Sequence, residues 1–227
     1  MGRSIADLGK TSGWFESLLP VEQDEETMQT QITIAALFFC IFVSELKAET
    51  ETLASGKTSK HSFTFYSGLG SPTPLPEILR ARGLELVHNS IVAGAYARRL
   101  SDGTGSADSE WEVNLAHHNE VLGRVSIGTA WVMRWKNPPW SSLLNSSLAI
   151  GNGVSYALGG IPSLENQLLD KTSAFLYHLL FEVTLAPQSW KQTDIVFRIH
   201  HRSGVFGLID GITGGSDFVC LGLKFRQ

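Results

Sequence analysis

The strongest constraint on the fold of this chain is a period-two alternation of apolar and polar side chains, which recurs from His61 to the end of the sequence. Side chains of an extended strand point to opposite faces in turn, so such a run predicts a strand with one apolar and one polar face. Turn residues separate about eight runs. We expect strands over 62–70, 84–100, 110–119, 124–136, 147–159, 173–185, 195–203 and 217–225, with short helical turns over 77–82 and 162–170 and a bulge near His88 and Asn89.

The length and polarity of these runs favour a barrel that crosses a membrane. A tilted strand needs about 9–11 residues to cross a bilayer. The polar faces carry small residues that suit a narrow lumen, and Trp131, Trp135 and Trp140 gather near one strand end, as in an interfacial aromatic girdle. We therefore predict an all-β fold, an eight-stranded antiparallel outer-membrane β-barrel. A soluble barrel or sandwich, with the apolar faces turned inward, stays open as the alternative.

Composition narrows the function classes. The formal net charge of -4 provides no basic surface for nucleic acid, so we expect no nucleic-acid partner. The two cysteines, Cys40 and Cys220, support neither a disulfide framework nor a cysteine metal site. His117 and His118 are neighbours on a strand and point apart, so they do not chelate one ion. We expect no metal and no organic cofactor.

The N-terminal region reads as an export signal. Residues 32–43 form an apolar run that is too short for a membrane-spanning helix but suits a secretory signal core, with cleavage expected after Ala48. The predicted organisation is an N-terminal extension and signal over 1–48, a linker over 49–60 and the barrel over 61–227, located in the bacterial outer membrane. Acidic residues over 23–26 are atypical before a signal core, and a short buried or interfacial helix is the alternative.

The last predicted hairpin places chemically active side chains on an apolar face. His201 and Ser203 are two residues apart and share the face of Ile195, Phe197 and Ile199, while His200 and Arg202 share the opposite face. An imidazole there can accept the serine proton. Asp217 begins the next strand on the matching face, where it can orient the imidazole and complete a triad. The alternative is that all three are ordinary residues at the barrel rim.

Over residues 195–226 the chain resembles the lipid A 3-O-deacylases of the PagL type, also called acyloxyacyl hydrolases. The resemblance lies in His201-Arg202-Ser203, which matches the family's His-x-Ser motif, followed by a loop and an acid at the start of the last strand. It implies an eight-stranded barrel, a triad of Ser203, His201 and Asp217 on the lipid-facing surface, and hydrolysis of an ester-linked acyl chain of lipid A, the substrate within lipopolysaccharide. The implied partners are this substrate and outer-membrane lipids. The sequence leaves open whether two copies form a homodimer.

Two departures from the family pattern bear on the site. Asp217 stands where the family has Glu, so a shorter side chain must reach His201. The loop after Ser203 contains no asparagine, so an oxyanion hole must come from backbone N–H groups near Gly204, Gly214 and Gly215. Two hypotheses of other classes stay open: a non-catalytic outer-membrane barrel with a structural or adhesive role, and a soluble ligand-binding barrel.

Overall fold

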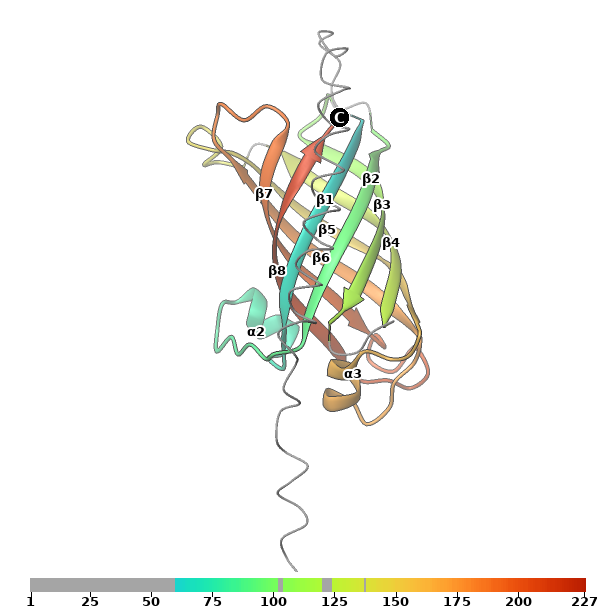
Figure 1. Ribbon diagram of the computed structural model, residues 1–227. Coiled ribbons are helices and arrows are strands. Elements are labelled where there is room, and N and C mark those ends of the chain that lie inside the picture. The colour runs from blue at the N-terminus through green and yellow to red at the C-terminus, as the bar shows by residue number, and fades with distance from the viewer. Residues whose placement is uncertain (1–59, 102–103, 120–123, 137) are drawn as a thin grey trace, which may run out of the picture. The chain divides into compact units, whose positions relative to one another are not determined.

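The alternating runs form the strands of a closed barrel. The computed structural model describes residues 60–101, 104–119, 124–136 and 138–227. Eight strands lie in this part of the chain (Figure 1). They are β1 (His61–Ser71), β2 (Ser90–Arg99), β3 (Ala107–His118), β4 (Val125–Lys136), β5 (Asn145–Leu158), β6 (Phe175–Ala186), β7 (Thr193–Ser203) and β8 (Gly215–Arg226).

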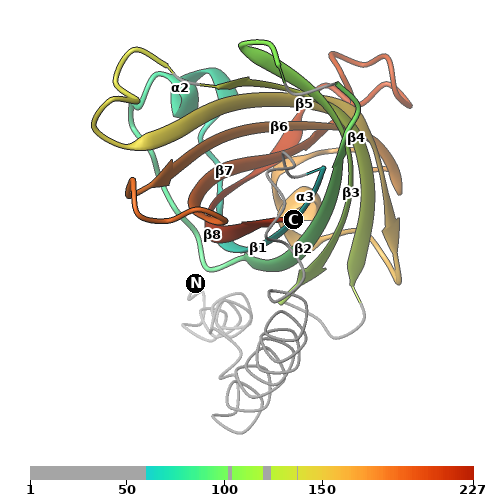
Figure 2. The same ribbon diagram turned by 90° about the horizontal axis from the view of Figure 1, so that it is seen from above.

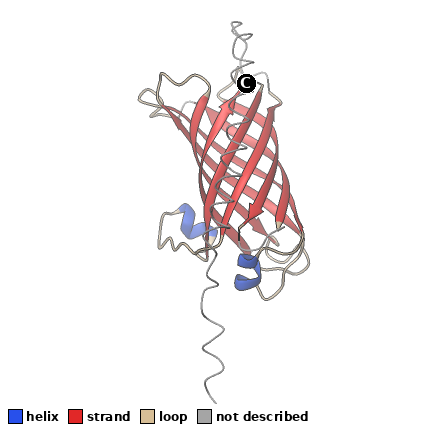
Figure 3. Cartoon of the chain, in the orientation of Figure 1, coloured by secondary structure: helices blue, strands red, loops and turns tan. Residues whose placement is uncertain are grey.

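Each strand pairs with the next along the chain, and β1 pairs antiparallel with β8 to close the sheet. The view along the barrel shows the strands arranged as a ring (Figure 2). Two short helices, α2 (Leu75–Leu79) and α3 (Ser163–Leu168), follow β1 and β5 and lie at the same end of the barrel (Figure 3). Because closure pairs every strand on both sides, it leaves no sheet edge exposed. The predicted fold class is confirmed.

The two faces of the barrel differ sharply in polarity. Inward-facing side chains include most of the buried polar and charged residues together with small and some larger apolar ones, whereas many outward-facing side chains are large, apolar and exposed. Outward examples are Trp111, Leu115, Ile127, Trp131, Trp135, Val154, Tyr156, Phe175, Phe197 and Leu221. A soluble barrel has the opposite arrangement, with an apolar interior and a polar surface.

Charged side chains fill the middle of the lumen. Arg198 donates two hydrogen bonds of 2.8 Å to Glu112 and also pairs with Glu182. The guanidinium carbon of Arg198 lies 4.8 Å from the centre of the Tyr66 ring. Buried charges are tolerated when they are paired and hydrogen-bonded, so these contacts make a packed interior rather than an open channel. His200, predicted to point inward, does so and contacts the Tyr66 hydroxyl at 3.1 Å.

Several predicted boundaries differ from the structure by one to three residues, and the start of the second strand differs by six. The second strand begins at Ser90 rather than residue 84, and the expected bulge near His88 is not part of a strand. Residues 85–87 are instead held beside the end of β1, where the Ser71 hydroxyl donates to the Glu85 carbonyl and the Val87 N–H donates to the Gly70 carbonyl. The first helix begins at Leu75 because Pro76 fits the first turn of a helix.

Among the described residues, no helix combines the length and apolar content that a membrane span requires. The predicted extension over 1–48 and the linker over 49–60, except for Lys60, lie outside the described residues, as does Cys40. Cys220 is a buried free thiol.

Candidate active site

The three predicted side chains come together on the outer face of the β7–β8 hairpin. His201 lies directly opposite Asp217 in the sheet, and Ser203 lies opposite Gly215. The His201 Nδ1 lies 2.8 Å from the Asp217 Oδ1, which is a hydrogen bond from the imidazole N–H to the carboxylate. This bond leaves the Nε2 of a neutral imidazole able to accept a proton. The base and the acid of the predicted triad are therefore in contact.

The register explains how a short aspartate reaches the imidazole. The Gly204 N–H donates to the Gly214 carbonyl, and the Arg226 N–H donates to the Gln192 carbonyl. Since hydrogen-bonded and non-hydrogen-bonded pairs alternate along an antiparallel ladder, both contacts make His201 and Asp217 a non-hydrogen-bonded pair. Such pairs bring opposite Cα atoms to about 4.5 Å, the closer of the two spacings. The close Cα spacing of this pair thus compensates for the methylene group that aspartate lacks relative to glutamate.

Gly215 provides the space in which the imidazole lies. A Cβ atom at this position would be 2.8 Å from His201 Cε1 and 2.8 Å from Ser203 Cβ. It would also be 2.5 Å from the backbone carbonyl of Arg202. The imidazole and the serine side chain therefore approach the same spot on the outer face. The sequence analysis named Gly215 only as a backbone donor to the oxyanion. It missed that the absence of a side chain at Gly215 leaves room for the His201 and Ser203 side chains.

Ser203, the predicted nucleophile, lies two residues after His201 in β7. Within the residues that the structure describes, no hydrogen bond joins the Ser203 hydroxyl to His201. The outer-face neighbours of Ser203 across β6 and β8 are Tyr177 and Gly215. Catalytic hydrogen bonds are often long without substrate and tighten when it binds. The structure therefore shows a hydrogen-bonded His201–Asp217 pair with Ser203 on the same outer face.

The His–Asp pair is shielded even though it lies on the outer face. His201 has a relative exposure of 9% and Asp217 of 5%. Ser71 of β1 pairs with Asp217 on its other side and is itself buried while it holds residue 85. Lower water access strengthens a hydrogen bond to a carboxylate. The segment before β2 is thus held at the end of β1, the strand that pairs with β8 at Asp217.

A histidine inside the lumen, His178, supports the backbone of His201 through a hydrogen bond. The Asn114 Nδ2 donates to the His178 Nε2 at 3.1 Å, so the His178 Nδ1 carries the proton and donates to the His201 carbonyl at 3.1 Å. This assignment of the proton follows from the hydrogen-bond network. Alternation along β6 is enough to put His178 on the polar face of its strand, but it does not link His178 to His201. The link depends on register between β3, β6 and β7, which alternation alone does not specify.

The loop after Ser203 exposes large apolar side chains. Phe206 is 97% exposed and Leu208 83%. Val205 and Phe206 have φ of 51° and 56°, a conformation that a β-branched or bulky residue adopts at a cost. The loop is tied to the segment before β6 by the Ser173 hydroxyl, which donates to the Asp210 carboxylate at 2.6 Å. An apolar, strained loop therefore borders the candidate nucleophile.

The predicted oxyanion donors differ in availability. The Gly204 N–H already donates to the Gly214 carbonyl at 3.1 Å, so it could serve an oxyanion only if that bond opened. Ser203 and Gly215 form a non-hydrogen-bonded pair, which leaves the Gly215 N–H out of the β7 ladder. Gly214 packs against Leu169, whose Cδ2 would be 2.4 Å from an added Cβ.

No group of three or more His, Cys, Asp or Glu side chains suits a metal ion anywhere in the described ranges.

Comparison with known proteins identifies the fold. No family model matches the chain, and no curated protein matches it. The crystal structure of the outer membrane enzyme PagL is similar, with a TM-score of 0.52 and 13% identity, over 72% of this chain and 98% of that chain. That of Neisserial surface protein A (NspA) has a TM-score of 0.44 and 8% identity, over 74% of this chain and 96% of that chain. The similarity to PagL shows a barrel fold of the outer-membrane type.

Proposed function

We propose that this chain is an outer-membrane serine esterase that removes an ester-linked fatty acyl chain from lipid A. The observation that carries the proposal is the hydrogen bond between His201 and Asp217 beside Ser203, on the outward apolar face. A soluble protein has little reason to shield an oriented base on its apolar exterior. A lipid-facing enzyme needs one there, because its substrate reaches the site through the membrane.

The proposed reaction uses the three side chains in sequence. Ser203 attacks the acyl carbonyl while His201 takes its proton, and Asp217 holds the imidazole and stabilises its charged form. His201 then gives the proton to the ester's alcohol oxygen as the bond from the acyl carbon to this oxygen breaks, so that the rest of the lipid leaves as an alcohol. Water hydrolyses the acyl-enzyme in a second step, which releases the fatty acid. Gly214 is the proposed backbone donor to the oxyanion, since the Gly204 N–H is engaged and the Gly215 N–H points away from β7.

The substrate class follows from location and resemblance together. The outward apolar side chains of the strands support a lipid-facing position for the proposed triad, and the His-x-Ser motif with a following acid resembles the pattern of the lipid A deacylases. The exposed Phe206 and Leu208 supply apolar surface for acyl chains next to the nucleophile. Localisation in the bacterial outer membrane is part of the same proposal, as is export by an N-terminal signal.

Mass spectrometry of lipid A tests the activity. Cells that express the wild-type chain should lose one acyl chain from lipid A, and cells that express Ser203→Ala should retain it. Ser101→Ala is the matched control, because Ser101 lies at the other end of the barrel, where it donates to Asp108. Membrane fractionation and heat-modifiable gel migration must first show a folded barrel. Identical lipid A in wild-type, Ser203→Ala and empty cells would refute the proposal.

A second candidate is a non-catalytic barrel with a structural or adhesive role. Two observations favour it: no hydrogen bond joins His201 to Ser203 in the described residues, and the lumen is packed with paired charges. Under this reading His201 and Asp217 stabilise the barrel rim. Asp217→Asn would then lower the unfolding temperature while lipid A stayed unchanged in all strains.

A further inference from the structure

The loop between β5 and β6 carries α3 into the lumen behind the candidate active site. Seen along the barrel, α3 lies within the ring of strands, at the end where β5 stops (Figure 1, Figure 2). Leu164 and Glu165 of this helix are both buried, and Leu164 belongs to an apolar cluster that includes Tyr66 and Phe218. The helix is therefore part of the packed interior of the barrel.

Glu165 contacts both strands of the β7–β8 hairpin from the inside. Its Oε1 accepts a hydrogen bond of 2.5 Å from the Arg202 Nη1 and one of 3.1 Å from the Ser216 hydroxyl. Arg202 and Ser216 lie directly opposite each other in the sheet, and both are shielded from solvent. One carboxylate oxygen therefore joins β7 to β8.

These contacts lie directly behind the proposed triad. Arg202 stands between His201 and Ser203 in β7. Ser216 comes directly before Asp217 in β8. Successive side chains of a strand point to opposite faces, so Arg202 and Ser216 point inward at the level where the triad side chains point outward. Glu165 thus holds the stretch of backbone from which all three triad side chains project.

The β5–β6 loop holds this end of the hairpin at further points. Arg202 donates a second hydrogen bond, of 3.1 Å, to the carbonyl of Ala174, the last residue of that loop. Leu169, directly after α3, packs against Gly214, the proposed oxyanion donor. The next inward position after Arg202 is Gly204, which has no side chain. The loop that contains α3 therefore supports the hairpin where the hairpin's own side chains do not.

We propose that Glu165 is a positioning residue for the triad of the esterase reaction proposed above, on which this role depends. It keeps β7 and β8 at the separation that lets Asp217 reach His201, a contact with little tolerance because aspartate is one methylene shorter than glutamate. Misplacement of reacting groups by about 1 Å can cost about 100-fold in rate. Loss of the Glu165 contacts should therefore lower kcat more than it raises KM.

Proton NMR of the His201 N–H tests this role without substrate, in the folded full-length protein in neutral detergent. The proton of a charge-assisted hydrogen bond to a carboxylate resonates at low field, and its displacement in Asp217→Asn assigns the signal. Glu165→Gln should move this resonance to higher field or broaden it by faster exchange with water. It should also lower kcat for lipid A hydrolysis about tenfold or more, while KM changes less than about twofold.

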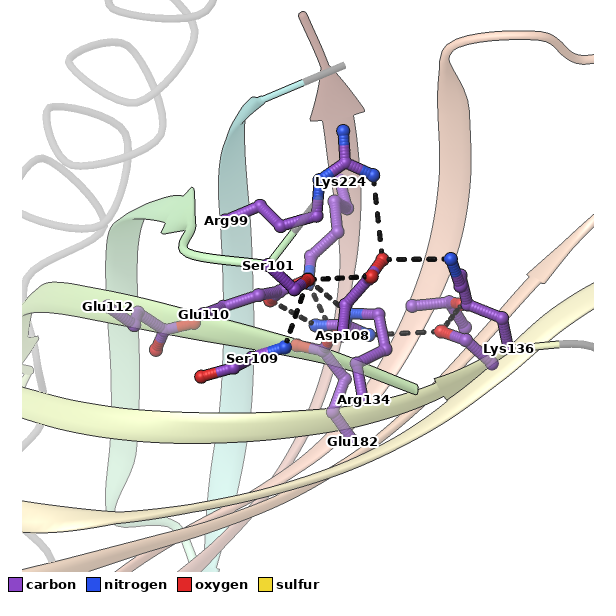
Figure 4. A network of polar contacts seen from close by, with 12 residues as sticks. Arg99, Ser101, Asp108, Ser109, Glu110, Glu112, Arg134, Lys136, Glu182 and Lys224 are labelled. Carbon is purple, nitrogen blue, oxygen red and sulfur yellow. Dashed lines mark hydrogen bonds and ion pairs between the residues drawn. The ribbon is translucent and has the colours of Figure 1, made fainter. Parts of the chain in front are cut away.

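Glu110→Gln is the matched control, because Glu110 pairs with Arg134 in the charge network at the other end of the barrel (Figure 4). Both residues are buried, so the same substitution breaks a buried ion pair there as well. It should leave the His201 resonance and kcat as in wild type. Ser216→Ala keeps the test valid if Glu165→Gln folds poorly, since it removes only a hydroxyl. It should displace the resonance in the same direction.

A resonance at the wild-type position in Ser216→Ala, or in folded Glu165→Gln, would overturn the proposal. So would an equal displacement in Glu110→Gln, which would show a general loosening of the barrel. Failure of the wild type to hydrolyse lipid A would instead refute the proposed function, while the resonance would still show whether Glu165 holds His201 against Asp217.

Discussion

Among single residues, Asp217 carries the sharpest consequence for catalysis. Asp217→Asn keeps the side-chain size but removes the charge that orients His201 and stabilises its protonated form. In well-studied serine hydrolases this change lowers kcat by about four orders of magnitude. We expect a loss of similar size in lipid A deacylation by the purified barrel. Asp210→Asn, the same change in the adjoining loop, should retain activity. Full activity in Asp217→Asn would show that this carboxylate does not support the base.

Gly215 makes a second prediction at the residue level. Gly215→Ala would place a methyl group within 2.8 Å of both His201 and Ser203 and within 2.5 Å of the Arg202 carbonyl. Overpacking of this kind costs about 1–3 kcal/mol. We expect lower resistance to urea together with at least a tenfold loss of esterase activity. In Gly105→Ala the nearest atom would be 3.6 Å away, so that variant should behave like wild type. A fully active Gly215→Ala would contradict the clearance role.

The β7–β8 loop is the element that we expect to set access to lipid substrates. Full burial of a large apolar side chain contributes about 1.5–3 kcal/mol. Phe206→Ser and Leu208→Ser should therefore raise KM for lipid A in vesicles about tenfold or more, while KM for a short soluble ester stays unchanged. Leu143→Ser, in an exposed loop at the opposite end, is the matched control. An equal loss on both substrates would instead indicate damage to the triad.

Secondary-structure elements were predictable to different degrees for physical reasons. Alternation reflects which face of each strand meets an apolar environment, so all the strands and the outward position of His201 and Ser203 could be predicted. The start of β2 could not, because the segment before it is held by the Ser71 hydroxyl and the Gly70 backbone, contacts that depend on where β1 ends. The contact from His178 to the His201 carbonyl likewise needs the register of three strands.

On the scale of the whole molecule, the outer and inner faces of the barrel wall have different roles. The outer face carries the proposed chemistry, and the inner face carries charges that must stay paired. The two are coupled where inner side chains hold the backbone of outer residues, as at His201. Both faces are needed to define the barrel. The apolar exterior determines which face of each strand points outward, and the polar interior determines which side chains meet across the lumen.

Arg198 provides the test at this scale. Arg198→Met would leave Glu112 buried without its charge partner, and loss of one member of a buried pair typically costs about 3–5 kcal/mol. We expect a corresponding fall in the free energy of unfolding, measured by urea titration with heat-modifiable migration. Arg80→Met removes an exposed partner from Glu77, and exposed pairs contribute only about 0–1 kcal/mol, so it should unfold almost like wild type.

The double variant Arg198→Met with Glu112→Gln separates an uncompensated charge from a lost packing contact. Removing the stranded carboxylate charge should recover part of the stability, because an unpaired buried charge is costlier than an amide of similar shape. If the double variant is no more stable than Arg198→Met alone, the main contribution of Arg198 is instead its packing over Tyr66, at 4.8 Å from the ring centre. Arg198→Met unfolding like Arg80→Met would show that the lumen pairs do not stabilise the barrel.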